Sequence, residues 1–162
     1  MAEPPGGRQG FILLPMRYLG LDVGDKRIGV ALSDETATLA SGLATVERVG
    51  SKKDPKAIAA LVREHEVGEV VVGLPRKLDG TIGPQAQKVL DFIEAIRGVL
   101  KVPVVPWDER FTSVMANQVL AEAEASRRER KANVDKVSAI LILQNYLDYR
   151  KVADAENRER PA

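Results

Sequence analysis

The first half of the chain alternates apolar and polar positions at the spacing of β-strands. Residues 17–23 and 28–33 are predicted to be strands, and a turn at residues 24–27 joins them into a hairpin. A third strand is expected within residues 39–48. The chain therefore begins with a predicted meander of three strands.

Strand and helix patterns alternate after this meander. Asp54 and Pro55 predict a helix start, with Asp54 as the N-cap residue and an apolar stripe that runs to about His65. Residues 69–72 are nearly all apolar, which is typical of a strand buried on both faces of a sheet. The remaining expected elements are a helix at 89–96, a strand at 102–107, and helices at 112–125 and 134–150, the last two joined by SRRERKA.

This order of elements predicts an α/β fold, a mixed five-stranded sheet with helices on both faces. A length of 162 residues with 44% hydrophobic content suits one domain with one core. We expect residues 1–16 to be a disordered extension, 17–150 the domain and 151–162 a flexible tail. Met16 directly precedes the first strand and is an alternative start of the functional chain.

Composition limits the chemistry that this domain can perform. The 24 basic and 23 acidic side chains nearly cancel, so binding to nucleic acid would require local clusters of positive charge. The absence of cysteine excludes disulfides, thiolate zinc sites and cysteine nucleophiles, and suits a reducing cytosol. The apolar run at residues 11–14 is too short for a membrane span or a signal peptide. We expect a cytoplasmic protein, with no membrane partner, that uses oxygen and nitrogen ligands.

Asp22 is an acid inside the first apolar strand. Period-two alternation places it on the same face as Gly20 and Gly24. An aspartate there is unfavourable unless it is paired or bound to a metal, and the glycines leave room for a cation or a phosphodiester. The alternative is that Asp22 caps the following turn through Gly24.

A second acidic position follows the strand at residues 102–107. Asp108 and Glu109 lie between this strand and the helix at 112–125, and mixed α/β sheets place their chemistry in such loops. The structural alternative is an ion pair with Arg110, which we expect for Asp108. Glu109 is therefore the candidate functional acid.

Asp135 lies near the start of the last expected helix. A helix N-terminus favours an anion, so a structural role is the ordinary explanation of this residue taken alone. However, Ser138 and Ala139 are small and lie one turn further on the same face. They would let the helix approach the sheet closely enough for Asp135 to reach Asp22.

Three converging acids would need cations. Mutual repulsion among Asp22, Glu109 and Asp135 would raise their pKa values unless divalent ions neutralise them. An all-oxygen site suits Mg²⁺ or Mn²⁺, and two such ions ~3.5–4 Å apart activate water and stabilise the leaving oxygen of a phosphodiester. The residues thus favour a metal-dependent hydrolase acting on ester bonds, with two ions.

Four motifs, in this order, resemble the YqgF/RuvX family of ribonuclease H-like nucleases, related in fold to the RuvC junction resolvases. They are LGLDVGDKRIGVALSD, VVGLPRKLDGT, WDERFTS and VDKVSAILIL, and the resemblance covers about residues 17–149. It implies a ribonuclease H-like fold, with Asp22, Glu109 and Asp135 as the catalytic and metal-binding acids. Lys136 follows Asp135, at a position where many members of the family carry a small residue. We expect this difference to have little effect on metal binding.

The resemblance also implies a nuclease, with two competing substrates. One is precursor small-subunit ribosomal RNA and the other is the Holliday junction, and we slightly favour RNA. Symmetric cleavage of a four-way junction requires two active sites, which a homodimer would supply, for example through exposed apolar residues of the helix at 112–125. Processing of ribosomal RNA makes no such demand.

Basic side chains cluster near the predicted acids in the chain. Each cluster alone is explained by a solvated surface, but their coincidence with the acids favours a rim that binds nucleic-acid phosphates. Lys26, Arg76 and Arg110 are the preferred members. The full set of candidate nucleic-acid-binding residues is Lys26, Arg27, Arg76, Lys77, Arg110, Arg127, Arg128 and Lys131.

Two other functions compete with a nuclease. The D-x-G sequence at Asp22 also resembles the phosphate loop of actin-like and sugar-kinase-like ATP-binding proteins, but these need two such domains and this chain has room for one. A non-catalytic factor that binds nucleic acid in ribosome assembly or at junctions stays open, because intact acids do not prove turnover.

Overall fold

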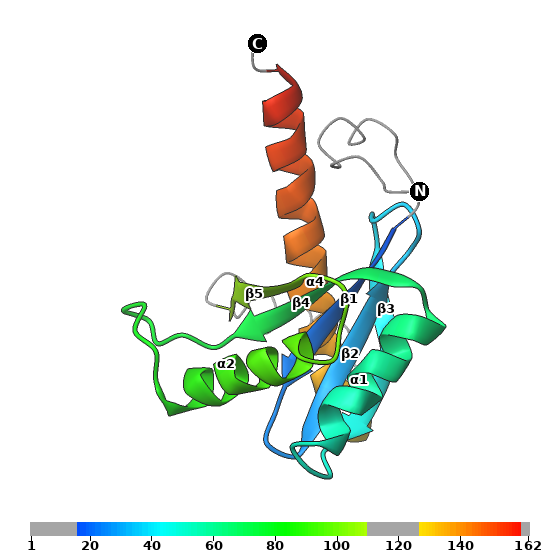
Figure 1. Ribbon diagram of the computed structural model, residues 1–162. Helices are drawn as coiled ribbons and strands as arrows, with labels where there is room; N and C mark the ends of the chain where they lie inside the picture. The colour runs from blue at the N-terminus through cyan, green and yellow to red at the C-terminus, as the bar shows by residue number, and fades with distance from the viewer. Residues whose placement is uncertain (1–15, 110–126, 160–162) are drawn as a thin grey trace.

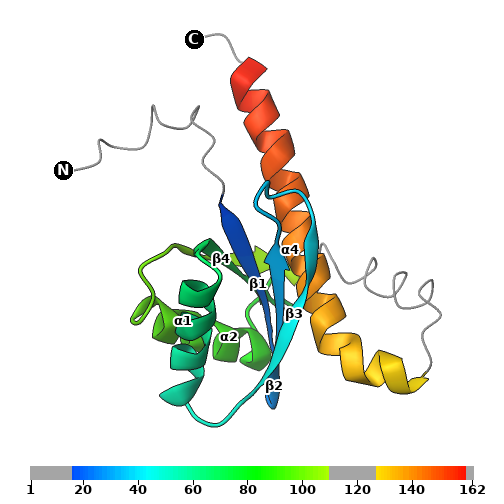
Figure 2. The same cartoon turned by 90° about the vertical axis from the view of Figure 1, so that its right-hand side faces the viewer.

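The computed structural model describes residues 16–109 and 127–159. Within the second range, the side chains are described for residues 136–157. Five strands form one sheet in the order β3-β2-β1-β4-β5. Helices α1 and α2 cover one face of the sheet and α4 covers the other (Figures 1 and 2). The predicted mixed five-stranded sheet with helices on both faces is confirmed. The elements are β1 (Arg17–Val23), β2 (Arg27–Ser33), β3 (Ala40–Glu47), α1 (Lys53–Glu64), β4 (Val67–Leu74), α2 (Pro84–Arg97), β5 (Val104–Asp108) and α4 (Arg127–Glu159).

The pairing of the strands brings three strand ends to one edge of the sheet. β1 is antiparallel to β2 and parallel to β4, and β4 is parallel to β5. Leu21 pairs with Val72, and Gly73 pairs with Trp107. Asp22 follows Leu21, and Glu109 lies two residues after Trp107, so both acids reach the same edge from strands on either side of β4.

The sheet has an apolar core on each face. The larger core, under α1 and α2, includes Leu19, Leu21, Ile28, Ile58, Val62, Val70, Val72, Ile93 and Ile96. The smaller core, under α4, contains Tyr18, Ala31, Val71, Ala139, Ile142, Leu143, Tyr146 and Leu147. Successive residues of β1 alternate between the two cores, as the period of a strand requires.

Gly20 lets α4 approach the centre of the sheet. A Cβ atom at Gly20 would lie 2.7 Å from Leu143 Cβ and 3.1 Å from the Ala139 carbonyl oxygen. No real side chain fits in that space, so the glycine in β1 and the small residue in α4 set the separation of helix and sheet. Of the two small residues expected to let this helix approach the sheet, Ala139 is fully buried and Ser138 is half-buried.

The start of α1 differs from the prediction. The helix begins at Lys53 with Lys52 as its N-cap residue, and Asp54 lies in the first turn. The Asp54 carboxylate accepts hydrogen bonds from the backbone N–H groups of Val49 and Gly50, upstream of the helix. The N-cap prediction was wrong because the preceding loop folds back and supplies these amides to Asp54.

α4 is longer than the predicted helix at residues 134–150. It begins at Arg127, within the segment expected to be a connection, and continues to Glu159. The added residues are rich in Arg, Lys, Glu and Ala, which are good helix formers, and no Gly or Pro interrupts them. Residues 1–15 of the expected extension at 1–16, the expected helix at 112–125 and Arg110 lie outside the described residues. None of the helices among the described residues combines the length and the hydropathy that a membrane span requires.

Candidate functional site

Asp22 and Glu109 form the centre of the candidate site. Asp22 is the next-to-last residue of β1, and Glu109 directly follows β5. Burial, together with the negative charges of Asp22 and Asp108, raises the pKa of Glu109 from 4.5 to about 7. The sheet therefore holds two carboxylates close enough to repel each other in a half-buried place.

Gly73 explains how the Glu109 side chain fits beside β4. A Cβ atom at Gly73 would lie 3.0 Å from both Cγ and Cδ of Glu109, and 2.5 Å from Ile142 Cδ1. Glu109 thus lies over the bare backbone of β4, on the face that α4 covers, and it approaches Asp22 from the far side of that strand. Sequence reasoning did not give this role to Gly73, although a glycine at the end of a buried strand is the signal for it.

The backbone of Asp135 comes to the same edge. α4 runs opposite to β1, because Leu143 lies against Gly20 whereas Tyr146, further along the helix, lies against Tyr18 with ring centroids 6.1 Å apart. Asp135 precedes Ala139 by one helical turn, which brings its backbone toward the level of Asp22. The side chain of Asp135 lies outside the described part of the chain.

The donor atoms of this site fit a divalent cation. Carboxylate oxygens are the ligands that Mg²⁺ and Mn²⁺ prefer. Burial is the main cause of the raised pKa of Glu109 and the charge of Asp22 adds to it, and a bound cation would offset both. Within the residues whose side chains are described, no three His, Cys, Asp or Glu side chains come together as a metal-binding group. A complete metal site would therefore need a further ligand, and the backbone position of Asp135 makes this residue a candidate.

The predicted basic residues differ in their surroundings. Lys26 and Arg27 are exposed in the hairpin, and Arg27 Nε lies 3.5 Å from Glu47 Oε2 across β2 and β3. Arg76 and Lys77 are exposed in the loop after β4, where Arg76 Nη1 donates to the Gly80 carbonyl oxygen over 3.4 Å. The backbones of Arg127, Arg128 and Lys131 lie in the first turns of α4, and Arg110 lies outside the described residues.

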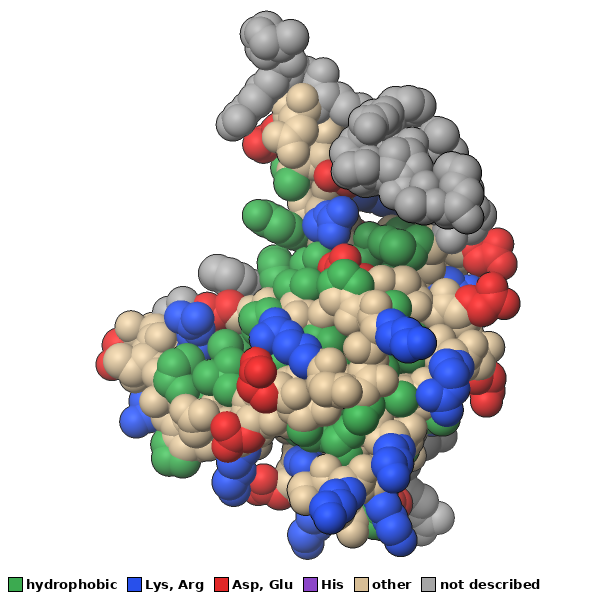
Figure 3. Space-filling model, viewed as in Figure 1, with side chains coloured by type: hydrophobic (Ala, Val, Ile, Leu, Met, Phe, Trp, Pro, Cys, Tyr) green, Lys and Arg blue, Asp and Glu red, His purple; other side chains and the backbone are tan. Residues whose placement is uncertain are grey.

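A further basic group lies beside the hairpin, and sequence reasoning missed it. Lys and Arg side chains gather at the lower end of the surface in Figure 3, where Figure 1 shows the β1–β2 turn and the loop from β3 to α1. Lys52, Lys53 and Lys56 are exposed in that loop and the first turn of α1. The Arg48 amide bonds to the Lys26 carbonyl oxygen over 2.9 Å, which joins loop and turn into one basic end. The sequence signal was the KK pair next to Asp54.

Comparison with protein families places most of the chain in one family model. Residues 16–149 match the model described as RuvX, Holliday junction resolvase. A proposed pre-16S rRNA nuclease of Thermoanaerobacter pseudethanolicus is 52% identical over 137 residues, which are 84% of this chain and 99% of the relative. A protein of the same name from Clostridioides difficile is 45% identical over 138 residues, which are 85% of this chain and 98% of the relative.

Solved structures share the fold at low sequence identity. RuvC of T. thermophilus, solved in complex with a Holliday junction substrate, has a TM-score of 0.57 at 14% identity and covers 85% of this chain and 96% of RuvC. The Holliday junction resolvase of fowlpox virus has a TM-score of 0.52 at 14% identity and covers 83% of this chain and 99% of the viral protein. At these identities the likeness shows the fold alone, and that fold is the ribonuclease H-like fold of the RuvC resolvases.

Proposed function

Because this chain belongs to the RuvX family, we propose that it is a divalent-metal-dependent endonuclease that hydrolyses phosphodiester bonds, with precursor 16S ribosomal RNA as the favoured substrate. Membership in the family and the names of the relatives support a nuclease. The names of the two relatives favour RNA over branched DNA.

The observation that carries the proposal is the coupling of Asp22 and Glu109. Two carboxylates held in a half-buried place, with the pKa of one raised to about 7 by burial and by the charge of the other, are unfavourable for stability. Proteins keep such pairs where the charge has a use, and hydrolysis of a phosphodiester is the use that matches oxygen ligands at a strand end.

We assign Asp22, Glu109 and Asp135 as the residues that hold Mg²⁺ or Mn²⁺. The bound ions would supply a lowered pKa for the attacking water and neutralise charge on the phosphodiester. Asp22 and Glu109 are held by two strands that flank β4, so the rigid sheet limits how far their oxygens can move apart. This rigidity matters because ligand placement within a fraction of an ångström decides the geometry of such a site.

The basic side chains would bind the phosphates on either side of the cleaved bond. Lys26 lies in the turn that follows Asp22, and Arg76 lies in the loop that follows β4, so each projects from the same edge as the acids. We add Lys52 and Lys53 to this set, because their loop is hydrogen-bonded to the same turn. Arg27 contributes less, since its guanidinium already faces Glu47.

The experiment that tests the proposal is cleavage of two matched substrates, a fragment of precursor 16S rRNA and a four-way DNA junction, in Mg²⁺ and in Mn²⁺. Wild type is compared with Asp22→Asn and Glu109→Gln, and Asp91→Asn, an exposed acid on α2, is the control. We expect both site variants to lose activity by about a thousandfold and the control to keep it. Activity that persists in excess chelator would overturn the metal mechanism.

The same experiment separates the second candidate function. The matching family model is described as a Holliday junction resolvase, which favours four-way junctions as the alternative substrate. Preferential cleavage of the junction would establish that role. Binding without cleavage of either substrate by the folded wild-type protein would instead establish the non-catalytic factor.

A further inference from the structure

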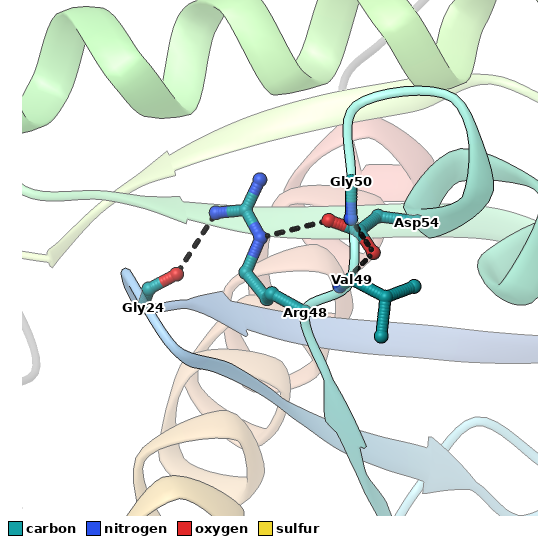
Figure 4. A network of polar contacts seen from close by, with 5 residues as sticks. All are labelled: Gly24, Arg48, Val49, Gly50 and Asp54. Carbon is teal, nitrogen blue, oxygen red and sulfur yellow. Dashed lines mark hydrogen bonds and ion pairs between the residues drawn. The ribbon is translucent and has the colours of Figure 1, made fainter.

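Arg48 is bonded to the turn that follows Asp22. The residue comes directly after β3, and its Nη1 donates to the Gly24 carbonyl oxygen over 2.9 Å while its Nε donates to Asp54 Oδ2 over 3.1 Å (Figure 4). Its backbone N–H donates to the Lys26 carbonyl oxygen over 2.9 Å. One residue thus holds the β1–β2 turn, residues 24–26, at two of its carbonyl groups.

Asp54 fixes the position of the Arg48 guanidinium. The residue is only 2% exposed, and its Oδ1 accepts hydrogen bonds from the N–H groups of Val49 and Gly50 over 2.8 and 3.3 Å. The guanidinium also lies over the Phe92 ring, with Cζ 5.1 Å from the centroid. The carboxylate and the aromatic ring leave the guanidinium little freedom, so the bond to Gly24 has a defined direction.

Gly24 connects this ion pair to the candidate site. It lies two residues after Asp22, and its N–H donates to the Arg27 carbonyl oxygen over 2.8 Å to close the turn. Movement of Gly24 would displace Asp22 through Val23. Glu109 would not move with it, because Glu109 follows β5, which is far from this turn along the chain. The spacing between Asp22 and Glu109 therefore depends on where the turn is held.

We propose that Arg48 is a positioning residue, which together with Asp54 holds the β1–β2 turn so that Asp22 keeps its place relative to Glu109. This inference rests on the proposed nuclease function. The effect of Arg48 on turnover is exerted through the Gly24 carbonyl group. Displacement of a reacting group by about 1 Å is enough to slow an enzyme a hundredfold.

The chemistry requires arginine at this position. A guanidinium donates from Nη1 to Gly24 and from Nε to Asp54 in one plane, whereas the single ammonium of a lysine cannot bond both acceptors in those directions. Arg48→Lys keeps the charge beside Asp54 and the backbone bond to Lys26, and it removes only the side-chain bond to Gly24. The variant therefore distinguishes a role of Arg48 in positioning the β1–β2 turn from a role in neutralising the buried Asp54 carboxylate.

Arg97 offers a matched control. Its Nη1 donates to Glu94 Oε2 and its Nη2 donates to the Val104 carbonyl oxygen, both over 2.8 Å. It is therefore also an arginine that joins a carboxylate to a backbone carbonyl group, but at the start of β5, the end remote from Glu109. Arg97→Lys reports what the loss of such a bond does when the candidate site is not involved.

The test compares wild type, Arg48→Lys and Arg97→Lys by three measurements. These are kcat and KM for the precursor rRNA fragment, the Kd for Mn²⁺ by calorimetry, and hydrogen exchange of the Gly24 amide. For Arg48→Lys we expect kcat to fall at least about tenfold with KM nearly unchanged, Mn²⁺ to bind several-fold more weakly, and Gly24 to exchange about tenfold faster. Arg97→Lys should match wild type in all three.

Wild-type kcat and Mn²⁺ affinity in Arg48→Lys would overturn the inference and leave the residue a stabilising contact. If Arg48→Lys does not fold, Asp54→Asn replaces it, because this variant keeps an acceptor for the Val49 amide and weakens only the hold on Arg48; the same criteria then apply. If wild type cuts no nucleic acid, the proposed function fails, and Mn²⁺ affinity and Gly24 exchange still decide whether Arg48 positions the acids.

Discussion

The side chain of Glu109 lies where a side chain at Gly73 would have to be, with Glu109 Cγ and Cδ both 3.0 Å from the position of a Cβ atom there. β4 thus contributes no side chain at this point of the candidate site, and its bare backbone lets an acid from one side approach Asp22 on the other. The burial that raises the pKa of Glu109 follows from the same arrangement.

Gly73→Ala should therefore disrupt the site from the middle strand. The added methyl group would lie 2.5 Å from Ile142 Cδ1 as well as against Glu109, so it pushes both α4 and the acid. We expect a loss of about 1–3 kcal/mol in the free energy of unfolding and a fall in kcat of at least about tenfold. Denaturant titration and single-turnover cleavage measure the two effects.

Gly98→Ala is the control for Gly73→Ala. Its φ of −70° is normal for alanine, and its Cβ atom would lie 3.4 Å from the nearest atom, the Ala95 carbonyl oxygen. This variant should cleave like wild type. Equal activity of both alanine variants would contradict the role given to Gly73.

Neutralising Glu109 should stabilise the metal-free protein at neutral and alkaline pH. The pKa of Glu109 is about 7 in the folded chain and 4.5 as its ordinary value. A raised pKa contributes stability that is fully present below about pH 4.5 and is lost as pH rises through about 7. The difference of about 2.5 pKa units, at about 1.4 kcal/mol for each unit, corresponds to a loss of roughly 3.5 kcal/mol in the free energy of unfolding.

Melting temperatures in chelator at about pH 5 and pH 8 test this effect. Glu109→Gln should melt above wild type at the higher pH and close to wild type at the lower pH. A pH-independent difference would mean that the carboxylate is not buried against Asp22. Added Mn²⁺ should raise the melting temperature of wild type more than that of Glu109→Gln.

The buried Asp54 carboxylate should make the protein sensitive to acid. Burial acts to raise its pKa, but the hydrogen bonds from the Val49 amide and from Arg48 outweigh it and lower the pKa below 3.8. A lowered pKa contributes stability that is present above the ordinary value and is lost as pH falls through the folded value. Asp54→Asn should therefore be less stable than wild type at neutral pH, and the difference should shrink below about pH 4.

Denaturant titrations across this range measure the difference. Asp91→Asn, an exposed acid on α2, should show no such convergence. A constant difference between Asp54→Asn and wild type from neutral to acid pH would show that charge is not what stabilises the pairing with Arg48.

Tyr146→Phe should loosen α4 on the sheet. The Tyr146 hydroxyl group donates to Glu69 Oε2 and accepts from Arg150 Nη1 over 3.1 Å, and Glu69 is only 9% exposed. Removing the hydroxyl group leaves this buried carboxylate with a weaker partner, Arg150 at 3.7 Å. We expect a loss of about 1–3 kcal/mol in the free energy of unfolding by urea titration.

Tyr149→Phe is the control for this tyrosine, because Tyr149 is 56% exposed on the same helix. Its stability should stay near that of wild type. If Tyr146→Phe were as stable as Tyr149→Phe, the bond to Glu69 would contribute nothing to the packing of α4 on the sheet.

Removing charge from the loop before α1 should weaken binding to nucleic acid equally for all base sequences. Lys52→Gln with Lys53→Gln removes two exposed charges beside the β1–β2 turn. We expect the slope of log K against log salt to become shallower by about one for each phosphate that these lysines neutralise in the wild-type complex. Lys101→Gln, exposed before β5, is the control, and an unchanged slope in the double variant would exclude this loop from the interface.

The order of the strands and helices that the structure describes was predictable from the sequence alone. Alternation along 17–33 predicted the hairpin, and the apolar run at 69–72 predicted the buried strand, because side-chain periodicity follows directly from the local geometry of the backbone. Asp22 was also recognisable locally, as an acid between glycines in an apolar strand. Its role as a catalytic acid remains a proposal.

The contacts between residues that are distant in the chain depend on the fold and could not be predicted from local patterns. Glu109 and Gly73 are far apart in the chain, and their contact depends on the parallel register of β4 and β5, which no local pattern encodes. Asp54 fits an N-cap pattern in the sequence, yet amides and a guanidinium contributed by the preceding loop hold its carboxylate instead. Local propensity is worth a fraction of a kcal/mol per residue, and buried partners brought by the fold outweigh it.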